Sequence, residues 1–379
     1  MKNNRTFLEK LLDGAEVEWK PLSLVTEMQR GKTITAKSAN EGKIPVISGG
    51  QKPAYYHSES NRDGKTITVA GSGAYAGYIM YWEEPIFVSD AFSIKTDESL
   101  LQIKYVYHFL LQNQQKIHAM KKGSGVPHVY PKDIGTLMIP IPPLSVQTKI
   151  VKILDALTAL TSELTSELTS ELILRRKQYE YYREKLLNID GVNKVIELGD
   201  VGPVRMCKRI LKNQTESSGD IPFYKIGTFG KKPDAYISNE LFQEYKQKYS
   251  YPKKGDILIS ASGTIGRTVI FDGENSYFQD SNIVWIDNDE TLVLNKYLYH
   301  FYKIAKWGIA EGGTIQRLYN DNLKKVKISI PPLKEQQRIV SILDKFETLT
   351  NSITEGLPLA IEQSQKRYEY YRELLLNFS

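Results

Sequence analysis

The chain of 379 residues has little cysteine and no long hydrophobic run. Its one cysteine, Cys207, excludes an internal disulfide and any cysteine-rich zinc site. No segment approaches the run of about 18 uncharged apolar residues that suggests a membrane-spanning helix, and the N-terminus lacks the apolar core of a secretory signal. We therefore expect a cytoplasmic protein with no membrane association.

Motifs for catalysis are also missing. A DNA amino-methyltransferase needs Asn or Asp before Pro-Pro and an aromatic residue, but Pro142-Pro143 and Pro331-Pro332 both follow isoleucine. No nucleotide-binding fingerprint or Walker motif is convincing. The five histidines lack metal-ligand spacing, and the matched His108 and His300 are expected to be core or surface residues. We expect no catalytic residue, no metal site and no cofactor bound by this chain.

The chain contains an internal repeat, because residues 139–189 recur 189 positions later. The segment IPIPPLSVQTKIVKILD matches ISIPPLKEQQRIVSILD, and a YEYYRE segment follows each of them. A chain with the same segment at the end of each half contains two copies of one unit. Such units can be related by a pseudo-two-fold axis, which suits a nearly two-fold target such as duplex DNA.

The segments that precede the repeated parts are glycine-rich, favour β-structure and echo each other faintly. The strand-like segments ending at Ser72-Gly73 and Ser262-Gly263 are similar. VSDAF at 88–92 resembles FQDSN at 278–282, which aligns Asp90 with Asp280. The two halves therefore share a scaffold and differ most in their polar residues, as two readers of different short targets would.

Each repeated part predicts a long helix. The Pro-Pro pairs end an extended segment, since the residue before proline avoids the α region. Apolar residues then recur at spacings of three and four, from Ile150 to Leu164 and from Ile339 to Ile353. This pattern favours two helices packed as an antiparallel coiled coil. The alternative is that each stripe packs on its own globular segment. Pro358 predicts a kink or break near residues 355–358.

The net charge of +6 is unevenly distributed. Residues 1–140 carry +3 and residues 191–330 carry +4, whereas residues 141–190 are neutral and residues 331–379 carry −1. Positive charge confined to the two non-helical segments is expected where they meet phosphates. The alternative is that such small charges are ordinary scatter, so charge alone does not establish DNA binding.

These features resemble the specificity subunits of type I restriction-modification systems over the whole chain. The repeated Pro-Pro segments, the paired long helices and the paired glycine-rich segments carry the resemblance. It implies an α+β fold with pseudo-two-fold symmetry, in which mixed α/β target recognition domains at 1–143 and 190–332 are joined and separated by two long antiparallel coiled-coil helices at 144–189 and 333–379.

The resemblance also implies a function. It indicates a non-catalytic subunit that binds double-stranded DNA, reads a split target and docks two methyltransferase subunits. Those subunits bring S-adenosylmethionine, and a restriction subunit is left open. The YEYYRE tyrosines lie on the helices and are expected to pack or to dock these partners. Two alternatives remain: the specificity partner of a fused methyltransferase-nuclease, or a coiled-coil scaffold that binds proteins.

A perfect tetrapeptide repeat, TSEL, occurs three times over residues 161–172. Each unit lengthens a helix by about 6 Å, which corresponds to roughly two base pairs. The first long helix is therefore expected to act as a ruler between two half-sites. A change in its length should change the gap that is tolerated and leave both half-sites the same.

Candidate DNA contacts lie in the glycine-rich loops, at the strand ends and after the first strand of each half. Glycines let the backbone approach a phosphate with its N–H groups free, and His, Gln and Arg can reach base edges. The alternative is that these glycines form ordinary turns. The candidates are Lys32, Ser72, Gly73, Gly123, Ser124, Gly125, His128, Lys208, Ser262, Gly263, Gly312, Gly313, Thr314, Gln316 and Arg317.

Overall fold

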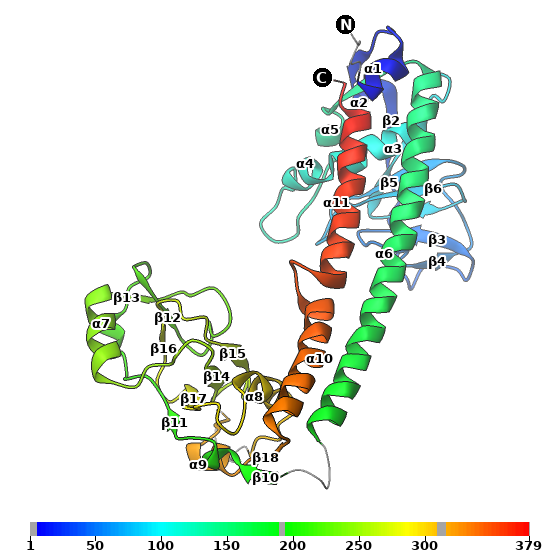
Figure 1. Cartoon of the computed structure of the whole chain (residues 1–379). Coiled ribbons are helices and arrows are strands. Elements are labelled where there is room, and N and C mark those ends of the chain that lie inside the picture. Colours follow the sequence, from blue (N-terminus) through cyan, green and yellow to red (C-terminus); the bar gives the residue numbers. More distant parts are fainter. Residues whose placement is uncertain (1–5, 189–193, 309–315, 379) are drawn as a thin grey trace, which may run out of the picture. The chain divides into compact units, whose positions relative to one another are not determined.

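The protein is described by a computed structural model that covers residues 6–188, 194–308 and 316–378. The chain divides into two compact units, and each is described by itself (Figure 1). Unit 1 comprises Met1–Leu168 and Ala360–Ser379, and unit 2 comprises Thr169–Leu359. Within the described ranges, every helix is too short or too polar to cross a membrane.

Unit 1 contains three small sheets. A two-stranded antiparallel sheet pairs the start of the recognition segment with its end, a four-stranded antiparallel sheet has the order β2-β8-β5-β6, and a three-stranded sheet has the order β4-β3-β7. Every residue of β5 (Thr66–Ala70) is buried, and β5 lies inside the four-stranded sheet between β8 and β6. The strands are β1 (Glu18–Pro21), β2 (Thr26–Arg30), β3 (Ile44–Ile47), β4 (Tyr55–His57), β5 (Thr66–Ala70), β6 (Ile79–Trp82), β7 (Phe87–Val88), β8 (Ala91–Thr96) and β9 (Met138–Ile141).

Unit 2 repeats this arrangement strand for strand. Its sheets have the orders β10-β18, β11-β17-β14-β15 and β13-β12-β16, and the parallel pair β3·β7 of unit 1 returns as β12·β16. The faint echo between the halves is therefore a shared fold. The strands are β10 (Lys194–Glu197), β11 (Val204–Arg205), β12 (Ile221–Tyr224), β13 (Tyr236–Ile237), β14 (Ile257–Ser260), β15 (Thr268–Ile270), β16 (Tyr277–Phe278), β17 (Ile283–Ile286) and β18 (Lys327–Ile330).

Short helices complete each unit. α3 and α8 occupy equivalent places and bury their apolar faces, which include His108 and His300. Both histidines are core residues, in agreement with the sequence. In unit 1 these helices are α1 (Phe7–Leu12), α2 (Leu22–Val25), α3 (Ile103–Gln112), α4 (Gln114–Ala119) and α5 (Pro131–Ile134). In unit 2 they are η1 (Leu198–Asp200), η2 (Lys212–Gln214), α7 (Asn239–Lys248), α8 (Asn295–Tyr302) and α9 (Asn320–Lys324).

The sequence alignment of Asp90 with Asp280 is wrong by two residues. β5 pairs Ala70 with Ala91, and β14 pairs the equivalent Ser260 with Ile283. The residue before the partner strand is thus Asp90 in unit 1 and Asn282 in unit 2. The turn in unit 2 is two residues longer, and it contains Ser281 at φ 58°. An insertion in a turn moves the alignment without changing the strands on either side.

The first long helix is continuous, and the second is divided. α6 runs from Leu144 to Leu187, whereas the second repeated part forms α10 (Leu333–Asn351) and α11 (Gly356–Leu376). The predicted break is confirmed, so the expectation of one long helix over 333–379 is wrong. The Ser352 hydroxyl accepts backbone N–H groups of the turn, and Gly356 has φ +80°, with no room for a Cβ beside the Leu349 carbonyl. Pro358 then lies in the first turn of α11, where proline is tolerated.

The long helices pack antiparallel within each unit, as the sequence predicts. In unit 1, α11 lies beside the first part of α6 (Figure 1), and the Thr158 hydroxyl lies 3.1 Å from that of Tyr368. In unit 2, the rings of Tyr179 and Tyr182 stack on Phe346 of α10, with centroids 6.1 and 5.7 Å apart. The apolar stripe also packs on the adjoining domain, because Ile150, Leu154 and Ile139 belong to one core. Both packing alternatives are therefore realised together.

A buried glutamine attaches each long helix to its domain. Gln147, which is 0% exposed, donates through its side-chain amide to the carbonyl oxygens of Leu100 at 3.2 Å and Pro142 at 2.8 Å. Its side-chain oxygen accepts from the backbone N–H of Gln102 at 2.9 Å. All three partners are main-chain groups, so the glutamine fixes the backbone at the start of α6.

The equivalent residue in unit 2 makes the same three bonds. Gln336 donates to the carbonyl oxygens of Leu292 at 2.9 Å and Pro331 at 2.8 Å, and accepts from the N–H of Leu294 at 2.9 Å. This glutamine is the Q of the repeated PPLxxQ segment. Its spacing from the prolines places its side chain against the loop that leads into α8.

A histidine–aspartate pair adds a second attachment. Nε2 of His108 lies 2.8 Å from Asp155 of α6, and Nε2 of His300 lies 2.8 Å from Asp344 of α10. Burial lowers the pKa of both histidines, against the opposing effect of the aspartates. The histidines are therefore neutral near pH 7 and donate to the carboxylates. Both contacts join a domain helix to the long helix that follows it.

Replacing the buried glutamine should destabilise unit 2 strongly. Gln336→Ala leaves two carbonyl groups and one N–H without partners, and we expect a loss of about 3 kcal/mol in the free energy of unfolding. The neighbouring Gln337 is exposed, so Gln337→Ala is the matched control and should change stability by less than about 0.5 kcal/mol. Urea denaturation followed by circular dichroism measures both. Equal losses in the two variants would contradict the assigned role.

Candidate nucleic-acid interface

A cleft in unit 1 lies where three separate segments meet. They are the end of β2, the turn between β7 and β8, and the returning loop before α5. The cleft has a volume of about 160 Å³. Its lining residues are Arg30, Gly31, Thr33, Gly71, Ser89, Asp90, Ala91, Phe92, His128, Val129, Tyr130 and Pro131.

Unit 2 has a larger cleft at the equivalent place. It is formed after β11, at the turn between β16 and β17, and at the returning loop near Arg317, and its volume is about 500 Å³. These three parts of the shared scaffold contribute to both clefts, and the end of β12 adds Phe223 and Lys225 to the larger one. The lining residues are Arg209, Ile210, Leu211, Lys212, Thr215, Phe223, Lys225, Gln279, Asp280, Ser281, Asn282 and Arg317.

In both units a strand-end serine holds a polar residue of the turn. The Ser72 hydroxyl donates to Oδ2 of Asp90. The Ser262 hydroxyl donates to Oδ1 of Asn282 at 2.7 Å, and Ser262 is only 4% exposed. The two serines are not lining residues themselves, but the residue that each one holds lies in the lining of its cleft.

Cationic side chains surround both clefts, more of them in unit 2. The Arg30 guanidinium lies 5.6 Å from the ring centroid of Tyr130 in unit 1. In unit 2, Arg209 donates to Asp280 at 2.8 Å, and Arg317 is exposed. Basic groups beside the polar side chains of Asp90 and Asn282 are suited to phosphates at the rim and to base edges within.

Several of the predicted residues meet at these clefts. Ser72 forms a β-bridge with His128, and the N–H of Gly73 donates to the carbonyl of Pro127 at 2.9 Å. Ser262 forms the equivalent bridge with Arg317. The strand ends and the returning loops, far apart in the sequence, are thus adjacent in each unit. The serine hydroxyls are already bonded, so these serines orient their neighbours.

Other predicted residues lie beside the clefts. Lys32 is exposed between two lining residues, and Gly263 is exposed at φ +65°. Gly123 has φ +109°, and a Cβ there would lie 2.8 Å from the Val126 carbonyl, so the tight turn itself requires a glycine. Ser124 and Gly125 are exposed in the same loop.

The remaining candidates are Lys208, Gln316 and the residues at 312–314. The Lys208 ammonium lies 5.0 Å from the ring centroid of Tyr249, which lines another hollow of unit 2. Gln316 is exposed next to Arg317. Gly312, Gly313 and Thr314 lie outside the described residues, so the sequence prediction for them stands as it was.

The cleft residues that the sequence prediction missed include Arg30, Asp90, Arg209 and Asn282. Asp90 was visible in the echo between the halves, but the alignment paired it with the wrong residue. The arginines carried no signal, because an arginine at a strand end is common on any surface. Only the folded sheets show that Arg30 and Asp90 line one cleft in unit 1, and that Arg209 and Asn282 line the equivalent cleft in unit 2.

Among the residues that the structure describes, one group of side chains has ligand types that could hold a metal: His300, Asp344 and Glu347. Lysines already neutralise this group, since Lys296 lies 3.0 Å from Asp344 and Lys303 is bonded to Glu347. The equivalent of Glu347 in unit 1 is a threonine. The group is therefore explained as an attachment of α8 to α10.

The single thiol is not exposed for chemistry. Cys207 is 2% exposed, and burial raises its pKa to about 12, which keeps it protonated. A nucleophilic or metal-binding role needs the thiolate.

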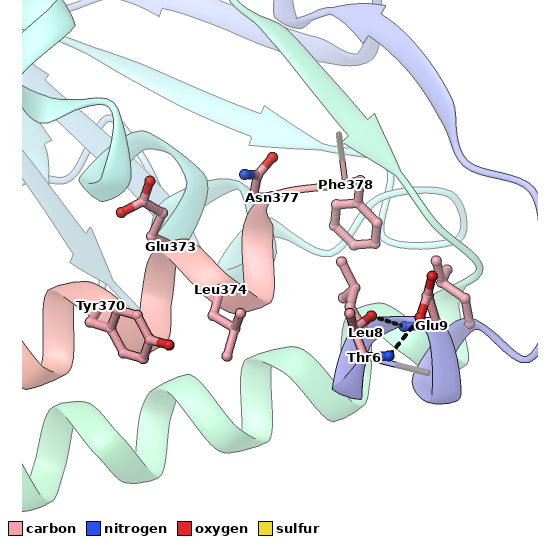
Figure 2. A pocket seen from close by; sticks show the side chains of 9 residues that line it. Thr6, Leu8, Glu9, Tyr370, Glu373, Leu374, Asn377 and Phe378 are labelled. Carbon is pink, nitrogen blue, oxygen red and sulfur yellow. Dashed lines mark hydrogen bonds between the residues drawn. The ribbon is translucent and has the colours of Figure 1, made fainter. Parts of the chain in front are cut away.

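Unit 1 also contains a hollow of about 610 Å³ between α1 and the end of α11. Figure 2 shows Leu8, Leu374 and Phe378 facing it, with Tyr370 at its side. The Thr6–Glu9 capping box fixes the start of α1. Its lining contains two carboxylates, Glu9 and Glu373, and no lysine or arginine, so it lacks the phosphate-binding groups of the clefts.

Comparisons with known proteins agree with this architecture. A family model described as the type I restriction modification DNA specificity domain matches residues 16–173 and again residues 192–363. A putative type I restriction enzyme specificity subunit from Haemophilus influenzae is 71% identical over 388 residues, with 100% of both chains covered.

More distant relatives are also type I specificity subunits. The EcoR124I/EcoR124II specificity subunit of Escherichia coli is 31% identical over 417 residues, covering 98% of this chain and 97% of that one. The crystal structure of the type I restriction-modification S subunit from M. genitalium matches with a TM-score of 0.53 at 16% identity, covering 97% of this chain and 98% of that one. At this identity the structural match concerns the fold alone.

Proposed function

The chain belongs to the type I restriction modification DNA specificity family, and from this premise we propose that it reads a split target in double-stranded DNA, one half-site per unit. Specificity subunits give a restriction-modification system its DNA sequence specificity, and that is the function of this chain. The proposal concerns how the two units divide the task.

The observation that carries the proposal is the pair of equivalent clefts. Three equivalent segments contribute to each cleft, but the lining residues differ: His128 in unit 1 takes the place of Arg317 in unit 2. A shared scaffold places the reading groups alike, and different side chains select different bases. Two unlike half-sites are the expected target of such a pair.

The chain itself is proposed to carry no catalysis. The chemistry and S-adenosylmethionine belong to partner methyltransferase subunits, which act on the DNA that this chain selects. The sequence supports this division, because no Asn/Asp-Pro-Pro-aromatic segment occurs and the buried Cys207 is protonated. A restriction subunit and a cytoplasmic location fit the same assignment.

Two methyltransferase subunits are proposed to dock on the ends of the long helices. In each YEYYRE segment the first tyrosine is buried, whereas the second is exposed, at 56% for Tyr181 and 61% for Tyr370. Each exposed tyrosine meets the next one edge-on, with centroids 5.4 Å apart. Two matching exposed aromatic surfaces favour two copies of one partner.

Two alternatives differ in class. A specificity partner of a fused methyltransferase-nuclease would use the same clefts, and only its partner protein distinguishes it. A coiled-coil scaffold that binds proteins would not need basic clefts at all. The unit-2 lining includes Arg209, Lys212, Lys225 and Arg317 with a single acidic residue, Asp280, which favours DNA.

The division of the target is tested by the motif that each variant binds. The full chain, assembled with its methyltransferase subunits, selects DNA from a library, and the bound sequences are read. His128→Ala should relax base preference only in the half-site of unit 1, and Arg317→Ala only in that of unit 2, by about 10- to 100-fold at one position. The controls are His118→Ala and Arg338→Ala, which lie outside both clefts.

Two results would count against this function. Relaxation of both half-sites by one variant would contradict the division between units. DNA binding by the parent complex that does not weaken steeply with salt would contradict phosphate contact and favour the scaffold.

The docking proposal predicts the stoichiometry of the complex. Tyr181→Ser and Tyr370→Ser should each lose one of two methyltransferase copies, because each removes a central aromatic anchor. Native mass spectrometry counts the copies. Tyr56→Ser is the control, since Tyr56 is 58% exposed in unit 1 away from the helices. Two copies retained by both helix variants would place the docking surface elsewhere.

A further inference from the structure

We propose that Asp90 and Asn282 discriminate between bases in opposite ways. Asp90 of unit 1 accepts a hydrogen bond from a base, and Asn282 of unit 2 donates one. The inference rests on the proposed reading of one half-site per unit, and it assigns the chemical class of base group that each cleft selects.

The two residues occupy the same place in the fold. Asp90 directly precedes β8, and Asn282 directly precedes β17. The backbone carbonyl of Asp90 accepts from the N–H of Gly71, the residue after β5, at 3.2 Å. The backbone carbonyl of Asn282 accepts in the same way from the N–H of Ala261, the residue after β14, at 2.7 Å. Sequence alignment hides this equivalence because of the longer turn in unit 2.

The strand-end serines fix which side-chain atom is left to face the cleft. Ser72 donates to Oδ2 of Asp90, and Ser262 donates to Oδ1 of Asn282. Among the described residues, none forms a hydrogen bond with Oδ1 of Asp90 or with Nδ2 of Asn282. The same serine bond therefore leaves an acceptor in unit 1 and an amide donor in unit 2.

Base edges in the major groove present matching partners. A carboxylate only accepts, so it matches the exocyclic amino group of cytosine or adenine. The amide N–H group of an asparagine matches an acceptor such as N7 or O6 of guanine, N7 of adenine or O4 of thymine. A carboxylate repels phosphates, which favours a base edge as the partner of Asp90.

The surroundings support these assignments. Arg30 and His128 line the cleft beside Asp90. Their side chains can donate hydrogen bonds to the DNA backbone on either side of the base that Asp90 contacts. In unit 2 the one carboxylate of the turn belongs to Asp280, whose side chain is 14% exposed and already bonded to Arg209 at 2.8 Å. It does not compete with Asn282, whose amide is the polar group that the serine orients.

Exchanging the two side-chain types tests the inference. Asp90→Asn should change the preferred base at one position of the half-site of unit 1, from one that presents an amino group to one that presents an acceptor, by about 10- to 100-fold. Asn282→Asp should cause the reverse change in the half-site of unit 2. The full chain with its methyltransferase subunits is bound to DNA with randomised half-sites, and the selected sequences are read.

The chain offers matched controls. Asp63 accepts from the Ser60 hydroxyl at 2.9 Å in unit 1, outside the cleft. Asn239 accepts from Gln243 at 3.3 Å in unit 2, also outside the cleft. Asp63→Asn and Asn239→Asp should leave the bound motif unchanged. Ser72→Ala should act on the same base position as Asp90→Asn. It should make that position less selective without changing the preferred base, because it removes only the bond that orients the Asp90 carboxylate.

Each other result has a defined meaning. Parental motifs in both Asp90→Asn and Asn282→Asp would overturn the inference. Loss of all binding by Asp90→Asn, with Ser72→Ala still selecting the parental base at full strength, would also overturn it. If the parent complex itself selects no split motif, the proposed function fails. If the parent complex selects a split motif and both exchange variants select the same one, only this inference fails.

Discussion

The attachment of each long helix to its domain by one buried glutamine is the constraint on which the rest depends. Gln147 and Gln336 bond only to main-chain groups, and the Asp155–His108 and Asp344–His300 pairs lie two turns further along each helix. A helix held at two points has a fixed direction and rotation relative to its domain. The same bonds occur in both units, so each long helix is attached to its domain in the same way.

Much of this architecture could be predicted from the sequence, because repetition and prolines are local signals. The Pro-Pro helix starts, the antiparallel packing and the break before Pro358 follow from spacing and backbone chemistry. The role of Gln147 did not, although its position in the repeat was visible. A glutamine is usually exposed, and its burial depends on the loop that it meets. The equivalence of Asp90 with Asn282 was also hidden, since two extra turn residues shift any sequence alignment.

The two units keep the same fold but differ in the residues that line their clefts. Strand order and helix attachments are retained, whereas the cleft residues change in charge and in hydrogen-bonding sense. Selection for different half-sites requires only such changes, because the backbone already presents them correctly. Both units have a strand-end serine at the same place, and its bond holds an aspartate in unit 1 and an asparagine in unit 2.

The TSEL tract lies where the two compact units join. The boundary falls between Leu168 and Thr169, inside the tract and inside the continuous α6, whereas the second repeated part is broken at 352–355. Each tetrapeptide adds about 6 Å to α6. The tract can therefore change in length without altering Gln147, the histidine pairs or either cleft.

The most direct measurement compares the methylated motif of cells that express the chain and its methyltransferase with three or with two TSEL units. The account predicts the same two half-sites with a gap shortened by roughly two base pairs. An unchanged gap, or a change in either half-site, would contradict two independent readers joined by a helical ruler.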